Sequence, residues 1–115
     1  MSYELQFLIM VNTTLDHEKL IASLKGALAD TSEVGWRSFD WSGNWVQVLM
    51  NEDYDESLAS DPEEGYLYYR YRIEVSPTDG NKSLDRQVNL AKHLKVALES
   101  LGCSAVICAA FEELL

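Results

Sequence analysis

Two stretches of helical period, separated by a block of strand-like sequence, constrain the fold of this chain more than any other feature. In residues 84–101, hydrophobic side chains recur every three or four positions, and a shorter stripe of the same kind occupies residues 15–29. Each stripe must be buried against another element, and the β-prone runs around the two stretches provide that surface. The sequence therefore predicts an α+β domain in which two amphipathic helices cover a sheet.

Alternating hydrophobic and polar residues mark the strands of this sheet. In chain order we expect a strand at 3–11, a helix at 15–29, short strands at 35–41 and 45–50, a strand at 66–75, a helix at 84–101 and a strand at 103–111. This β-α-β-β-β-α-β order predicts an antiparallel sheet with both helices on one face. The outline resembles the ferredoxin-like split βαβ arrangement with an extra hairpin. A chain of 115 residues suits one domain, so residues 1–115 are assigned to a single α+β domain.

The predicted strand at 66–75 has the clearest alternation in the chain. One of its faces, which includes Leu67, is expected in the core. The other face is expected to be wet or to contact a partner, and it carries Tyr66, Tyr68, Arg70 and Arg72.

Two cysteines, Cys103 and Cys108, fall on the last predicted strand. Their spacing puts them on opposite faces and about 16 Å apart, which is too far for a disulfide. We expect two free thiols in small core residues, as in a reducing compartment. The strand itself is built from small and β-branched residues, so we expect both of its faces to be covered.

Residues 51–65, NEDYDESLASDPEEG, hold seven of the nineteen carboxylates and no Lys or Arg. The other hundred residues carry twelve acids and nine bases, so most of the net charge of −10 comes from this segment. We expect a long loop whose charge forms a binding surface for a basic protein partner. The same charge disfavours contact with nucleic acid or an anionic membrane, because like charges repel.

Aromatic side chains border the acidic segment on both sides. Trp36, Trp41 and Trp45 fall on the predicted hairpin, and regular alternation puts at least one of them outside the helix-covered core. Tyr54 lies inside the segment and is an anchor candidate, since Tyr is enriched at interface hot spots. The predicted partner-binding residues are Glu52, Asp53, Tyr54, Asp55, Glu56, Asp61, Glu63, Glu64, Trp41, Trp45, Tyr66 and Tyr68.

Other chemistries lack their sequence signatures. An EF-hand register that starts at Asp53 places Leu58 where the loop requires Gly, so we expect no calcium site. His17 and His93 fall on predicted helices, where we expect them to be exposed and far from a nucleophile or a second ligand. Without a phosphate-binding loop, a metal-ligand cluster or a nucleophile elbow, we predict no enzymatic activity, no metal and no cofactor. The N-terminus has no signal-peptide features, and we expect a cytoplasmic protein.

Three functions fit this pattern. The first is a protein-binding module, most specifically an inhibitor or immunity protein that neutralises a basic toxin or nuclease through the acidic loop and its flanking aromatics. The second is a DNA mimic that inhibits a nucleic-acid-binding complex, which requires acids spread at phosphate-like spacing. The third is a regulatory domain that holds a small ligand near the Trp hairpin and forms a homodimer through its open sheet face. The first is our working hypothesis.

Overall fold

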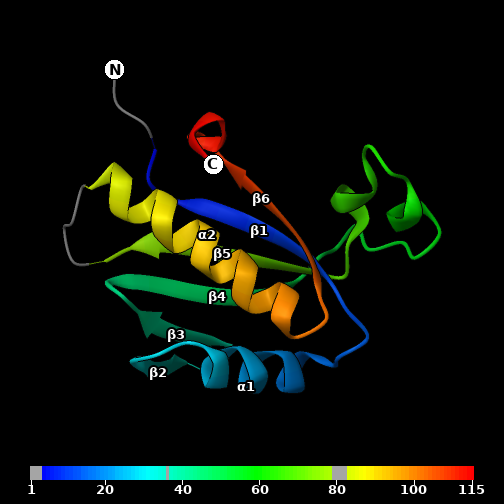
Figure 1. The fold of residues 1–115 in the computed structure, drawn as a ribbon. Coiled ribbons are helices and arrows are strands. Elements are labelled where there is room, and N and C mark those ends of the chain that lie inside the picture. Colours follow the sequence, from blue (N-terminus) through cyan, green and yellow to red (C-terminus); the bar gives the residue numbers. More distant parts are fainter. Residues whose placement is uncertain (1–3, 36, 79–82) are drawn as a thin grey trace.

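The computed structural model describes residues 4–35, 37–78 and 83–115, and within them the chain forms one antiparallel sheet of six strands with two α-helices on one face (Figure 1). The strand order is β2-β3-β4-β5-β1-β6. The strands are β1 (Phe7–Asn12), β2 (Thr31–Gly35), β3 (Ser38–Trp41), β4 (Asn44–Met50), β5 (Tyr71–Pro77) and β6 (Ser104–Ala109). The helices are α1 (His17–Ala27) and α2 (Leu84–Ser100), and short 3-10 turns are η1 (Leu58–Ser60), η2 (Gly65–Tyr68) and η3 (Glu112–Leu114). The predicted α+β class is confirmed.

The β2–β3 hairpin widens the sheet at one edge. Without it, the strands and helices follow the order β-α-β-β-α-β, which is the order of a split βαβ arrangement. The ferredoxin-like outline itself stays a prediction.

Side-chain caps fix where both helices begin. Asp16 accepts a hydrogen bond from the backbone N–H of Lys19 at 2.9 Å, and Ser83 accepts one from that of Arg86 at 3.2 Å. Gly102 follows the end of α2 with a φ of 85°, a left-handed conformation that favours glycine. The Ser83 cap and the stop at Gly102 are both predicted by the sequence. No helix in the described part of the chain is long and apolar enough to cross a membrane.

One hydrophobic layer joins both helices to a single face of the sheet. Leu20 and Leu24 of α1 and Leu94 and Leu98 of α2 are fully buried in the same cluster as the inner-face strand residues. Each such side chain contributes about 1.5–3 kcal/mol when it leaves water, so this layer supplies most of the stability. The inner face of the three central strands is formed by Phe7, Ile9, Val11, Val46, Val48, Tyr71, Ile73 and Val75.

A buried pair of side-chain amides crosses this layer. Asn44 at the start of β4 and Gln87 near the start of α2 are 1% and 2% exposed. Nδ2 of Asn44 donates to Oε1 of Gln87 at 3.2 Å, and Nε2 of Gln87 donates to Oδ1 of Asn44 at 3.0 Å. Gln87 also donates to the Leu5 carbonyl at 3.0 Å, and Asn44 to the Ser42 carbonyl at 3.2 Å. The pair therefore fixes α2 against both the β3–β4 turn and the segment that leads into β1.

The predicted strand at 66–75 is wrong in its first half. β5 begins only at Tyr71, and the preceding residues form η2. Leu67, which we expect in the core, is 46% exposed, and Tyr66 and Tyr68 do not share a sheet face with Arg72. Alternation alone could not reveal this, because the turn is held by contacts with residues distant in sequence.

The sheet has one strand more than the sequence predicts. The predicted elements include no strand between the helix at 15–29 and the strand at 35–41, but β2 begins at Thr31, directly after Asp30, whose φ of 58° is left-handed. β2 pairs with β3 and has an irregular register between Glu33 and Gly35. The single strand predicted at 35–41 is therefore the end of one strand and the whole of the next, and Trp36 lies outside the described residues.

β6 packs into the core through one face only, that of Ala105, Ile107 and Ala109, so the prediction that both of its faces are covered is wrong. Val106 and Cys108 on its outer face are only half-buried. Both cysteines are free, as predicted; Cys103 is buried in the core, whereas burial of Cys108 is partial. That partial burial, together with the nearby Glu112 carboxylate, raises the pKa of the Cys108 thiol.

Replacing Gln87 by Ala is expected to lower the free energy of unfolding by about 2–4 kcal/mol, because Asn44 and the Leu5 carbonyl lose their buried partner. Urea unfolding followed by circular dichroism measures the change. Asn89→Ala, at an exposed position on the same helix, is the control and should change the free energy by less than about 0.5 kcal/mol. Equal stability of the two variants would contradict the role given to the amide pair.

Candidate functional site

The acidic segment forms a folded lobe between β4 and β5, whereas the sequence predicts a long loop. We name residues 51–69 the acidic lobe; it holds all seven carboxylates of the segment and no Lys or Arg. The lobe projects beyond one end of the sheet (green in Figure 1), and its turns η1 and η2 contact each other. Its charge is therefore carried by a compact structure.

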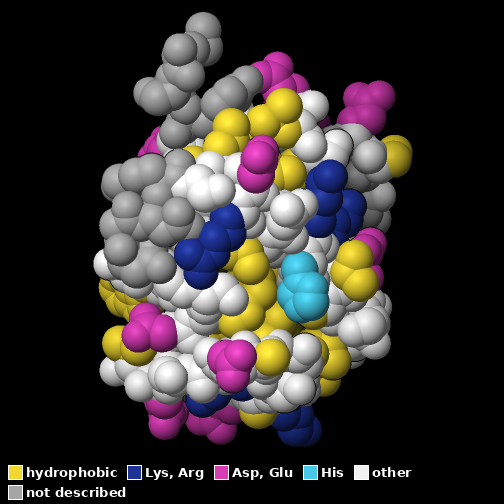
Figure 2. Space-filling model, turned by 60° about the vertical axis from the view of Figure 1, so that its left-hand side comes forward, with side chains coloured by type: hydrophobic (Ala, Val, Ile, Leu, Met, Phe, Trp, Pro, Cys, Tyr) yellow, Lys and Arg dark blue, Asp and Glu magenta, His cyan; other side chains and the backbone are white. Residues whose placement is uncertain are grey.

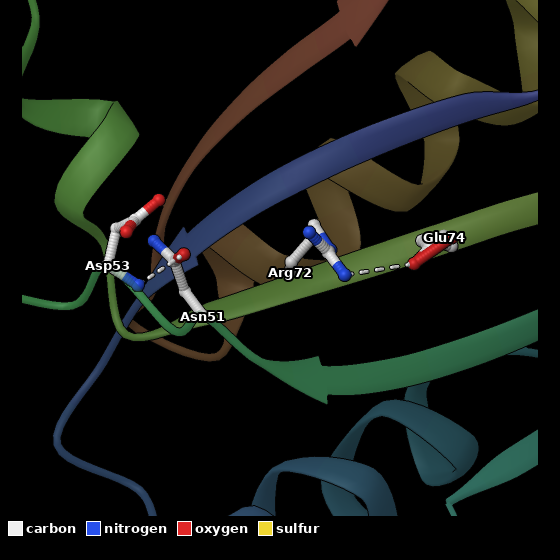
Figure 3. Close-up of polar contacts among 4 residues, drawn as sticks. All are labelled: Asn51, Asp53, Arg72 and Glu74. Carbon is white, nitrogen blue, oxygen red and sulfur yellow. Dashed lines mark hydrogen bonds and ion pairs between the residues drawn. The ribbon is translucent and has the colours of Figure 1, made fainter.

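The side chain of Asn51 closes the base of the lobe. Its Nδ2 donates to the carbonyls of Leu67 at 2.9 Å and Tyr69 at 2.8 Å, and its Oδ1 accepts from the backbone N–H of Asp53 at 3.1 Å (Figure 3). Its own backbone N–H donates to the Arg70 carbonyl at 2.9 Å. Asn51 is only 9% exposed, so these bonds are shielded from competing water. One amide thus joins the beginning of the lobe to its end.

Two of the seven carboxylates fold the lobe backbone. Oδ1 of Asp55 accepts from the backbone N–H groups of Ser57 at 3.0 Å and Leu58 at 3.2 Å, and from the Ser57 hydroxyl at 2.7 Å. Oδ1 of Asp61 accepts from the backbone N–H groups of Glu63 at 2.8 Å and Glu64 at 3.3 Å. Such turns are a common use of Asp in irregular backbone. The hydrogen bond from the Ser57 hydroxyl, followed by that from Leu58, lowers the pKa of Asp55.

Gly65 lets the two turns of the lobe pack closely. A Cβ atom at this position would lie 2.4 Å from the carbonyl oxygen of Ala59 and 2.8 Å from its carbonyl carbon. These are backbone atoms of η1, which cannot rotate away as a side chain could. Glycine is therefore required at the contact between η1 and η2.

The side chains of the other five carboxylates are exposed, and they do not take part in folding the lobe backbone. No ion pair within the described residues joins any lobe carboxylate to a base. Among them lie three exposed hydrophobic side chains, Tyr54 at 43%, Leu58 at 46% and Leu67 at 46%. The lobe surface therefore combines uncompensated negative charge with apolar groups that a partner could bury. The five carboxylates are those of Glu52, Asp53, Glu56, Glu63 and Glu64.

Arg70, the base next to the lobe in sequence, is engaged at the root of the lobe. Its guanidinium donates to the Leu15 carbonyl at 3.1 Å and stands 5.1 Å from the centre of the Tyr71 ring. The Tyr71 hydroxyl donates to the same carbonyl at 2.9 Å, and burial raises its pKa while Arg70 opposes that rise. Arg70 therefore ties the lobe to the β1–α1 connection, and the position on a sheet face predicted for it is wrong.

The predicted aromatic residues divide between surface and core. Trp45 is 37% exposed on the face opposite the helices, so the expectation that one Trp lies outside the core is confirmed. Trp41, predicted to bind a partner, is 3% exposed and packs in the core, which leaves it little surface for that role. Tyr66 and Tyr68 are half-buried within η2.

The two histidines differ in exposure. His93 is exposed, as predicted, and its ring stacks on Trp41 with a centroid distance of 6.0 Å. His17, also expected to be exposed, is half-buried because its Nε2 donates to the Val48 carbonyl at 2.6 Å. This bond ties the start of α1 to β4.

A hollow of about 330 Å³ lies between α2 and the turns before β2 and after β3. Trp41, His93, Asp30 and Leu90 are among its lining residues. Figure 2 shows hydrophobic side chains gathered beside a histidine, with charged side chains of both signs scattered around them. This hollow is near the Trp hairpin, where the small-ligand alternative would place its ligand.

The residues that build the lobe are not among those predicted from the sequence. Asn51 and Gly65 hold its base and its central contact, and Leu58 and Leu67 add apolar surface. A glycine between an acidic run and an aromatic run is the one signal of a close contact that the sequence offers. Nothing in the sequence distinguishes Asn51 from a loop asparagine, because its partners lie sixteen and eighteen residues away.

Comparison with known proteins finds no family model, no curated protein and no solved structure that matches this chain. Within residues 4–35, 37–78 and 83–115, no three His, Cys, Asp or Glu side chains are grouped so that they could hold a metal ion.

Gly65→Ala is expected to destabilise the protein by about 1–3 kcal/mol, since the new Cβ collides with η1 backbone. Hydrogen exchange should accelerate most in residues 51–69. Gly26→Ala is the matched control: a Cβ there meets no atom within 4 Å, and Ala in helix α1 should add about 0.5–1 kcal/mol. A stable Gly65→Ala with unchanged exchange in the lobe would contradict the close packing described here.

Asp55 should titrate below its ordinary pKa of 3.8, and Ser57→Ala should raise that pKa, because the Ser57 hydroxyl is the largest cause of the shift. A depressed carboxyl pKa stabilises the fold above the unfolded-state value, and the contribution is lost as pH falls through the lower folded-state value. NMR titration of the Asp55 side-chain carboxyl measures both variants. An unshifted Asp55 in the unaltered protein would contradict the turn geometry.

Proposed function

We propose that this chain binds a basic protein through the acidic lobe, and more specifically that it acts as an inhibitor or immunity protein that neutralises a basic toxin or nuclease. The observation that carries the proposal is that the seven carboxylates have two different roles, one structural and one at the surface. Asp55 and Asp61 hold the backbone, while the other five are exposed and form no ion pair with a base within the part of the chain that the structure describes. A charged surface on a folded support loses less conformational entropy on binding than the same charges on a mobile loop.

The composition of the lobe surface supports a protein partner. Concentrated negative charge accelerates encounter with a positively charged surface and excludes acidic partners. Tyr54, Leu58 and Leu67 provide exposed apolar groups within the charged region, and such groups carry most of the affinity at protein interfaces. A nuclease or toxin that binds polyanions presents the complementary surface, a cationic cleft with apolar walls.

The distribution of charge favours this function over DNA mimicry. A DNA mimic requires carboxylates spaced over an extended surface, as phosphates are along a duplex. Here the strand residues on the face opposite the helices include only three charged side chains, Asp40, Arg72 and Glu74. The lobe therefore carries −7 of the net charge of −10.

Neutralising the five free carboxylates as E52Q, D53N, E56Q, E63Q and E64Q should abolish capture of the basic partner and leave the fold intact, because Asp55 and Asp61 are kept. The measurement is affinity capture from source-cell lysate with crosslinking and mass spectrometry, followed by titration of the captured protein. At least a hundredfold weaker binding is expected, about 0.5–1 kcal/mol for each lost charge.

The matched control neutralises five exposed carboxylates elsewhere, as E4Q, E18Q, D40N, E99Q and E112Q. Each variant has a net charge of −5, since five carboxylates are removed from a net charge of −10. Tyr54→Ala, which changes no charge, should also weaken binding. If the two charge variants lost the same amount of binding affinity, the effect would come from net charge alone. If the lobe variant captured the partner as well as the unaltered protein does, the lobe would have no part in binding.

A further inference from the structure

The face of the sheet opposite the helices is a second surface with its own chemistry. We name it the open face; it consists of the outward-pointing residues of the strands. Across the sheet, Val106, Met10, Arg72 and Leu49 lie in one row, and Cys108, Leu8, Glu74 and Gln47 lie in the next. Apolar side chains therefore flank Arg72 on both sides, whereas Glu74 lies between Leu8 and the polar Gln47.

The charged pair marks the centre of the open face. Nη2 of Arg72 lies 3.3 Å from Oε2 of Glu74, and the two side chains are 41% and 23% exposed (Figure 3). Because the residues are two positions apart on one strand, both project from the same face. With Asp40, these are the charged strand residues on this face, so it carries a charge of −1 out of the net −10.

We propose that the open face binds a second copy of this chain, sheet against sheet. A two-fold axis between the sheets, perpendicular to β5 and midway between Arg72 and Glu74, places each Arg72 opposite Glu74 of the second copy. The same axis places Met10 opposite Leu8 of the second copy and Val106 opposite its Cys108. The face is therefore self-complementary in charge. Its apolar contact comes mainly from Leu8, Val106 and Cys108, since Met10 is only 7% exposed and Leu49 falls opposite Gln47. Stacked sheets lie about 10 Å apart, a gap that Arg and Glu side chains span.

Charge selects a second copy as the occupant. Two chains of net charge −10 repel each other wherever the acidic lobes approach, but the open face has balanced charge at its centre. The lobes project beyond the end of the sheet, so pairing through this face leaves them available to the partner proposed above (Figure 1). The dimer is independent of that partner, and either proposal can fail alone.

The size of the face sets the expected affinity. Six strands about 4.8 Å apart and about 20 Å long give a plane of roughly 480 Å² on each copy. Two such planes bury about 1,000 Å² in total, near the lower limit for a specific interface. A dissociation constant on the order of 10–100 µM is therefore expected, with the apolar rows supplying affinity and the ion pairs fixing the register.

Sedimentation velocity from 1 to 500 µM tests the proposal. The unaltered protein should shift from the mass of one chain towards that of two. R72E leaves two carboxylates at the centre of the face and E74R leaves two guanidinium groups, so each variant alone should stay monomeric. An equimolar mixture of R72E and E74R should form a heterodimer, because each charge then faces its opposite.

K25E is the matched control, since it makes the same charge change as R72E on the helix-covered side and should dimerise normally. Leu8→Lys should block association without removing a charge. Melting curves by circular dichroism establish that each variant is folded. The proposal is overturned if the unaltered protein is monomeric at 500 µM, or if folded R72E and E74R fail to associate when mixed.

Discussion

Two helices supply one hydrophobic layer, and that layer can bury only one face of the six-stranded sheet. Every other property of the molecule depends on this one-sided burial. Apart from the buried Asn44 amide, the inner face of the central strands is apolar, whereas the open face has to combine apolar and charged side chains to stay compatible with water. The same limit leaves the outer face of β6 without a covering helix, although its small and β-branched sequence is typical of a strand covered on both sides. The composition of a strand indicates whether both of its faces could be buried, but the number of covering helices decides whether they are.

Side-chain amides hold turns and connecting segments, which the backbone hydrogen bonds of the helices and the sheet do not hold. Asn44 and Gln87 join α2 to a turn and to the segment before β1, and Asn51 joins the two ends of the acidic lobe. An amide is suited to these places because it donates and accepts at once without carrying a charge into a buried site. The lobe then keeps its charge for the surface, since its backbone depends on Asn51, Gly65 and only two of its seven carboxylates.

The accuracy of the sequence predictions followed the range of the interactions concerned. The helices were predicted well because Ser83, Gly102 and the leucine stripes act within a few residues. The first half of the strand at 66–75 was predicted wrongly. Its residues do alternate, but they form η2, because Asn51 hydrogen-bonds to Leu67 and Gly65 packs against Ala59. The tryptophans were distinguished only in part, since alternation puts at least one of Trp36, Trp41 and Trp45 outside the core but cannot say which face the helices cover.

The sequence by itself determined the α+β class, the two helices, the free cysteines and the concentration of negative charge in one segment. Those properties depend on local period, capping and composition, which are set by residues close together in the sequence. Only the tertiary structure decided that the acidic segment is a folded lobe, that Asp55 and Asp61 hold its backbone, and that Arg72 and Glu74 lie at the centre of an open face. These features arise when residues far apart in the chain are brought together by burial, and burial is settled by the whole fold.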